Sequence, residues 1–102
     1  MNYDPSATRP YIGNLTLTSA NTEYSLELPT YMKSITIKLR NTAHSARFAF
    51  KAGGPNATTG TFITIPAGGV PFEQSVKLAG TIYFESPDAG AVVEIFGMVQ
   101  SA

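Results

Sequence analysis

The chain has 102 residues, no cysteine, seven basic residues, seven acidic residues and a formal net charge of zero. This length predicts one domain. The absence of cysteine excludes disulfides, thiolate nucleophiles and zinc sites built on thiolates. A net charge of zero provides no overall attraction to nucleic acid or to an anionic membrane, and it does little to oppose self-association. We therefore expect neither nucleic acid nor a membrane among the partners.

The first residues, Met1 to Pro5, show neither the basic nor the apolar region of a secretion signal. No apolar run approaches the roughly 20 residues that a membrane-spanning helix needs. These two observations predict a protein that is cytosolic when it is made.

Apolar and polar residues alternate in short runs from Gly13 to Val99, and Gly, Pro, Asn and Ser separate the runs. A period of two predicts strands, and no window shows the 3.6-residue period of a helix. The predicted strands are 13–18, 22–28, 33–40, 45–51, 61–65, 70–78, 81–86 and 91–99. They predict an all-β fold, a single-domain eight-stranded antiparallel sandwich with jelly-roll or related Greek-key topology. An immunoglobulin-like sandwich is the alternative, which the lack of tryptophan disfavours.

Two segments fall outside this alternation. Residues 1–12 contain Pro5 and Pro10, which favour extended backbone, so we predict an N-terminal arm preceding a domain of residues 13–102. The arm is expected to order on a partner through Tyr3 and Tyr11. Residues 52–60 are small and polar, which predicts the longest and most mobile loop.

Catalytic and metal-binding patterns are weak in this sequence. A metal-binding barrel needs several histidines, and His44 is the only one. A Ser-His-Asp triad from His44 with Asp4 or Asp88 lacks a nucleophile elbow. A carboxylate pair drawn from five glutamates is not excluded by spacing, but a small domain offers little room for a deep cleft. We therefore expect no enzyme activity, no cofactor and no metal, and His44 as a solvated loop residue.

Four of the basic residues fall on two consecutive predicted strands. If the apolar positions of these strands face the core, Lys38, Arg40, Arg47 and Lys51 share the outer face of one hairpin. Such a face is either simply solvated or binds an acidic protein. Nucleic acid is the weaker alternative because no aromatic residue lies between these charges to stack on bases.

The last predicted strand is apolar on both faces. Ala91, Val93, Ile95 and Val99 occupy one face, which we assign to the core. Val92, Phe96 and Met98 occupy the other, interrupted by Glu94. That second face either packs under a loop or is an exposed apolar patch, and exposed patches mark interfaces. Phe96 and Met98 are the anchors expected in the second case.

Four segments together resemble small virion proteins of tailed bacteriophages. They are residues 34–40 (SITIKLR), 64–69 (TIPAGG), 81–87 (TIYFESP) and 92–95 (VVEI). The resemblance covers roughly residues 30–99 and carries no catalytic motif. It implies a capsid decoration (cement) protein with a β-sandwich fold, located in the virion on the outside of the shell. Such a protein binds the major capsid protein and bridges neighbouring subunits.

The expected contact residues follow from the arm, the basic residues and the last strand. They are Tyr3, Tyr11, Lys38, Arg40, Arg47, Lys51, Phe96 and Met98. A homo-oligomer is expected. The alternative function is a carbohydrate- or receptor-binding module of a phage tail or fibre. Sugar-binding modules usually present coplanar aromatic rings, whereas the five tyrosines are scattered along this chain.

Overall fold

The structure, a computed structural model, describes residues 8–56, 58–74 and 78–100. Its strands are β1 (Thr8–Leu17), β2 (Tyr24–Leu39), β3 (Ala46–Ala49), β4 (Ile63–Ile65), β5 (Phe72–Gln74), β6 (Leu78–Glu85) and β7 (Ala91–Gln100). Every pairing is antiparallel. Within these three ranges no helix could span a membrane. The all-β prediction is confirmed.

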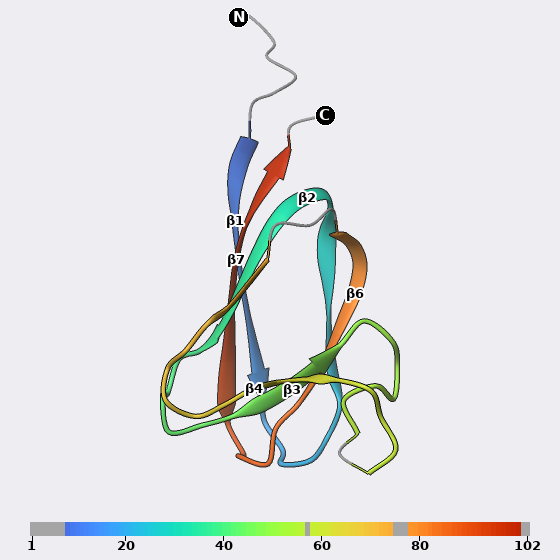
Figure 1. Cartoon of the computed structure of the whole chain (residues 1–102), viewed down its shortest axis with the longest axis vertical. Helices are drawn as coiled ribbons and strands as arrows, with labels where there is room; N and C mark the ends of the chain where they lie inside the picture. The colour runs from blue at the N-terminus through green and yellow to red at the C-terminus, as the bar shows by residue number, and fades with distance from the viewer. Residues whose placement is uncertain (1–7, 57, 75–77, 101–102) are drawn as a thin grey trace, which may run out of the picture.

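The strands form one curled sheet that resembles half of a barrel (Figure 1). Its order is β1-β7-β2-β6-β3-β4, and β5 pairs with β2 beside this path. In Figure 1, β1 and β7 run together along the long axis, while β3 and β4 cross the lower half of the view. The described residues form seven strands in this one curled sheet, in place of the predicted eight-stranded sandwich of jelly-roll or Greek-key topology.

The difference in count arises in β2, which joins the predicted strands 22–28 and 33–40. The chain continues as a strand through Pro29 and Thr30, between these two predicted ranges. Tyr31 takes a positive φ of 62°, and the register shifts between Leu28 and Met32. A β-bulge of this kind lets a strand change direction without ending.

The two halves of β2 have different neighbours. Tyr24 to Leu28 pair with β6, and Met32 after the bend also pairs with Leu78 of β6. Met32 and the residues from Ser34 to Leu39 pair with β7, and Ile35 to Ile37 also pair with β5 on the other edge. β2 therefore links the β6-β3-β4 part of the sheet to the β7-β1 part.

The core lies inside the curl. Its buried apolar residues are Leu17, Leu28, Met32, Ile35, Ile37, Leu39, Ala46, Phe48, Ile65, Ile82, Phe84, Ala91, Val93, Ile95 and Val99. Phe48 is central: its ring centroid lies 5.0 Å from that of Phe72 and 6.1 Å from that of Phe84. The core face predicted for the last strand is confirmed, because its four residues are at most 1% exposed.

β1 begins earlier than the sequence suggested. It pairs with β7 along its whole length, from Thr8 opposite Gln100 to Leu17 opposite Ala91. Residues 8–12 therefore belong to the sheet, and their assignment to an arm was wrong. Pro10 is compatible with this position because β1 is an edge strand. Residues 1–7 lie outside the described residues, so an arm there stays a prediction.

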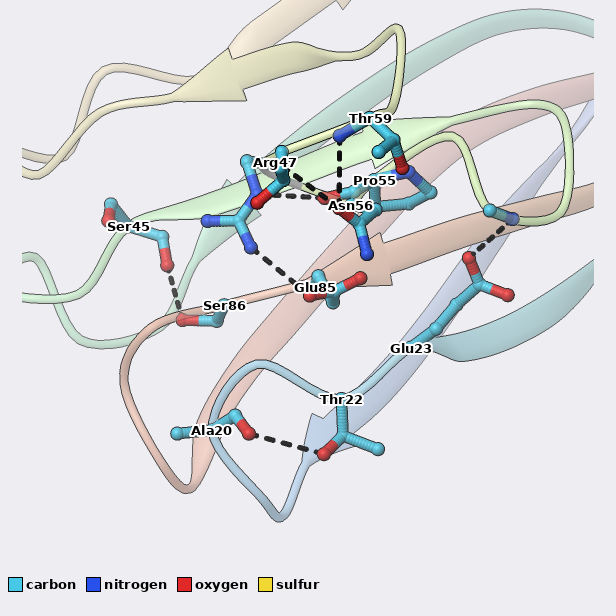
Figure 2. A network of polar contacts seen from close by, with 12 residues as sticks. Ala20, Thr22, Glu23, Ser45, Arg47, Pro55, Asn56, Thr59, Glu85 and Ser86 are labelled. Atoms are coloured by element: carbon cyan, nitrogen blue, oxygen red, sulfur yellow. Dashed lines mark hydrogen bonds and ion pairs between the residues drawn. The ribbon is translucent and has the colours of Figure 1, made fainter.

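The connection between β3 and β4, residues 50–62, is the longest in the chain. Figure 2 shows how Arg47 holds it: Nε donates to the Pro55 carbonyl over 2.8 Å, and Nη2 reaches Glu85 Oε1 at 3.3 Å. The Gly53 backbone N–H also donates to Glu23 Oε1 at 2.8 Å. These contacts attach the loop at Gly53 and Pro55, and its predicted mobility stays a prediction.

Two phenylalanines on β3 and just after it provide a test of this core. Phe48 is 1% exposed and Phe50 is 51% exposed. We expect Phe48→Ala to lower the free energy of unfolding by about 3–5 kcal/mol, because it leaves a cavity. Phe50→Ala removes less buried surface and should cost about 1 kcal/mol. Urea denaturation of both variants measures the difference, and equal losses would contradict the described burial.

Candidate functional site

The side chains that point away from the core on β1, β7 and the second half of β2 form one continuous surface, which we call the outer face. Because successive residues of a strand point to opposite sides, the register of the three strands arranges these side chains in rows. The rows are Pro10–Met98–Ser34, Ile12–Phe96–Thr36 and Asn14–Glu94–Lys38. Neighbours within a row lie about 4.5–5.5 Å apart between Cβ atoms.

The centre of the outer face is apolar and exposed. Ile12 is 72% exposed and its direct neighbour Phe96 is 46% exposed. Met98 lies half-buried in the next row. A shallow groove runs between Ile12 and Phe96 and continues over Thr36 and Asn14. Large apolar side chains on directly opposite residues that face solvent are a typical feature of contact patches.

Charged residues border this patch on one side. Glu94 accepts a hydrogen bond from Arg40 Nε at 2.9 Å, and its other oxygen lies 3.1 Å from Lys38 Nζ. The hydrogen bond from Arg40, and after it the one from Lys38, lowers the pKa of Glu94. Exposed pairs of this kind add little stability. They do hold two cations and one carboxylate in fixed positions beside the apolar patch.

The structure does not bring the four predicted basic residues together. β6 lies between β2 and β3 in the sheet, so Lys38 and Arg40 do not share a hairpin with Arg47 and Lys51. The Arg47 side chain is 12% exposed and pairs with Glu85, which is 9% exposed. Lys51 is exposed in the loop after β3. The predicted basic hairpin face is therefore wrong, because strands adjacent in sequence are not adjacent in the sheet.

The remaining predicted contact residues divide between the two sides of β1 and β7. Phe96 and Met98 lie on the outer face. Tyr11 is half-buried and packs against the core, where its ring covers Gly13. Tyr3 lies outside the described residues.

Ile12 is the outer-face residue that the sequence reasoning placed in the arm. The alternation that reveals its position includes Gly13, which has no side chain and therefore hides the period of two. Extending the pattern Leu17, Leu15 back to Gly13 and Tyr11 as core positions places Ile12 outside.

Backbone hydrogen bonds hold the turn around His44. His44 is half-buried, and its backbone N–H donates to the Asn41 carbonyl at 3.0 Å. Asp88, one of the triad partners considered above, accepts a hydrogen bond from the Ser45 backbone N–H at 3.0 Å. Among the described residues, no three His, Asp or Glu side chains are grouped so that they could hold a metal ion.

Comparison with known proteins identifies no relative of this chain. No protein-family model, no curated protein and no solved structure matches the chain.

The charged border of the outer face provides a test by NMR titration. Replacing Arg40 with Gln should raise the pKa of Glu94 toward its ordinary value, because the main hydrogen bond that lowers it is lost. Lys51→Gln, a change of the same charge in the loop after β3, should leave that pKa unchanged. Equal responses to the two substitutions would contradict the described pairing.

The same shift sets the sign of a small pH effect. The pKa of Glu94 is lower in the folded state, so its pairs stabilise the fold above the unfolded-state pKa. That contribution is lost as the pH falls through the folded-state pKa, and it should be smaller in Arg40→Gln.

Proposed function

We propose that the chain is a non-catalytic structural module that binds a protein surface through the outer face. The observation that carries this proposal is the pair Ile12 and Phe96, two large apolar side chains that lie opposite each other and face solvent. Burial of such a pair against a partner is favourable by roughly 25 cal/mol for each Å² of apolar surface removed from water.

The surroundings of this pair fit a protein partner. Protein interfaces combine an apolar centre with a polar rim, and they favour aromatic residues, Met and Arg. The outer face has Phe96 and Met98 near its centre and Arg40 with Lys38 at its border. Glu94 between these two cations favours a partner that offers both charge signs over a uniformly acidic one.

We further propose that the partner is the major capsid protein and that the chain decorates the outside of a bacteriophage shell. The support is the resemblance of four segments to small virion proteins. Two of these segments, residues 34–40 and 92–95, contribute side chains to the outer face. Lys38, Arg40 and Glu94 come from them. On this proposal the protein is made in the host cytoplasm and then bridges neighbouring capsid subunits, which stabilises the shell.

A small contact patch suits this role. A single outer face of three strands makes a modest interface, and modest interfaces bind weakly. A closed shell presents many identical sites, so a protein that contacts two neighbouring subunits gains affinity through effective concentration. Residues 1–7 are a further candidate for contact, and their role stays a prediction.

The alternative, a carbohydrate-binding module of a tail or fibre, has less support. Sugar rings stack on aromatic side chains that share a plane. In the described part of the chain the large exposed aromatics are Tyr31, Phe50 and Phe96, which lie at the bend of β2, after β3 and on β7. They come from three separate segments. Clear binding on a glycan array would favour this alternative over the capsid.

Two residues of nearly equal exposure make a matched test. Phe96 on the outer face is 46% exposed, and Ile63 on β4 is 49% exposed. Phe96→Ser should weaken binding to shells assembled from the major capsid protein of the same genome by at least about tenfold, as expected for an interface anchor. Ile63→Ser should bind as the parent chain does. Co-sedimentation with increasing protein measures both affinities, and circular dichroism checks that both variants fold.

Three outcomes would contradict the proposal. They are a parent chain that saturates no shell, an equal loss of binding in the two variants, and a genome that encodes no major capsid protein. The first and third reject the capsid as the partner, and the second rejects the outer face as the contact.

A further inference from the structure

The free edge of β1 is the longest unpaired edge of a whole strand in the described sheet. β1 has ten residues and pairs with β7 alone. The other terminal strands, β4 and β5, have three residues each. Natural sheets protect their edges with short strands, charges or prolines because an open edge can pair with another chain. β4 and β5 are protected by their shortness. β1 has one such device, Pro10 near its start, and the rest of the strand toward Leu17 has none.

The hydrogen-bond pattern shows which residues of β1 face this edge. The Arg40 backbone N–H donates to the Val92 carbonyl at 3.0 Å, so these two residues form a hydrogen-bonded pair. Such pairs alternate along antiparallel strands. Even-numbered residues of β7 therefore bond to β2, and odd-numbered residues bond to β1. It follows that odd-numbered residues of β1 bond to β7.

The even-numbered residues of β1 consequently direct their backbone groups to the open edge. They are Thr8, Pro10, Ile12, Asn14 and Thr16. Pro10 has no N–H, but its missing donor would have pointed away from β7, so the β1–β7 ladder is complete. Free donors remain at Ile12, Asn14 and Thr16. They lie in a stretch, residues 11–17 (YIGNLTL), that contains no charge and no proline.

We propose that the β1 edges of two copies pair antiparallel about a twofold axis at Ile12, which gives a homodimer with a continuous sheet. In this register Ile12 faces Ile12 of the second copy, Asn14 faces Pro10, and Thr16 faces Thr8. The Asn14 N–H then donates to the Pro10 carbonyl, while the reciprocal bond to the Asn14 carbonyl is lost because Pro10 has no N–H. Every contact occurs twice, as an isologous interface demands.

The side chains along the open edge of β1 favour a second copy of the chain as the pairing partner. No charged residue stands opposite another, because all even-numbered residues of β1 are uncharged. Ile12 of each copy already lies beside Phe96 of its own sheet. Pairing therefore joins two apolar patches into one row, Phe96–Ile12–Ile12–Phe96, and cross-strand apolar pairs are the stabilising unit of a sheet. An unrelated strand would need to supply a matching apolar residue at this point.

This dimer goes beyond the proposed function and does not depend on it. Pairing uses the backbone edge of β1, while the outer faces of both copies stay on one side of the joined sheet. A capsid would then meet two outer faces at once. A failure of the dimer would leave the effect of Phe96→Ser on shell binding unchanged, so the two proposals can be rejected separately.

Single cysteines test the register directly, because the chain has no cysteine of its own. In a hydrogen-bonded antiparallel pair the Cα atoms are about 5.5 Å apart, which a disulfide can span. Ile12→Cys should therefore form a covalent dimer under mild oxidation. Asn14→Cys is the matched control: its two thiols are offset by four residues, about 14 Å along the strand. It should cross-link at least tenfold more slowly. Equal rates, or faster cross-linking of Asn14→Cys, would overturn the proposal.

Amide hydrogen exchange tests the same pairing in the unaltered chain. The amides of Gly13 and Leu15 should be protected at every protein concentration, because they bond to β7. Those of Ile12 and Asn14 should gain at least tenfold protection as the concentration rises through the dimer transition seen by sedimentation. Rapid exchange of the Ile12 and Asn14 amides up to millimolar protein concentration would show that β1 is not the interface. Rapid exchange of these amides in a protein that does dimerise would show the same.

Discussion

β2 is a single strand of 16 residues whose first half pairs with β6 and whose second half pairs with β7 and β5, while Met32 just after the bend still pairs with Leu78 of β6. The bend at Pro29 to Tyr31 changes the direction of the strand, and the sheet curls because both halves keep their partners. Curling lets the inner surfaces of β3 and β6 meet those of β7 and β1 around Phe48 and Phe84. Without the bend these residues would line one open face in contact with water, and the apolar core could not close.

The outer face is a consequence of the same geometry. The curl covers one side of the β1-β7-β2 part of the sheet, and the alternation of each strand directs the other half of its side chains outward. The chain places Ile12, Phe96 and Met98 among those outward positions, where the fold itself gains little from them. Glu94 and its two cations lie beside them because Lys38 and Glu94 are cross-strand neighbours. The resulting surface combines apolar contact with fixed charge, and this combination carries the proposed binding role.

The sequence predicted features that depend on the residue pattern along one strand, and it failed on features that depend on pairing between distant strands. The period of two identified the all-β fold and the core face of β7, because each depends on neighbours along one strand. The prediction of a basic hairpin was wrong because β6 lies between β2 and β3 in the sheet. This strand order depends on pairing between residues that are far apart in sequence. Pro29 and Pro10 also misled the prediction. One sits at a bulge and the other on an open edge, where a missing N–H removes no ladder bond. The partnership of Arg47 with Glu85 and Pro55 had no local signal at all.

The proposed contact between the outer face of β1, β7 and β2 and the capsid can be seen in an electron cryo-microscopy reconstruction of shells saturated with the protein, because such a map shows the orientation of every strand. We expect β1 and β7 to lie against the shell with Ile12 and Phe96 buried, while the loop of residues 50–62 points toward solvent. A reconstruction in which β3, β4 and that loop contact the shell and Phe96 faces solvent would contradict it.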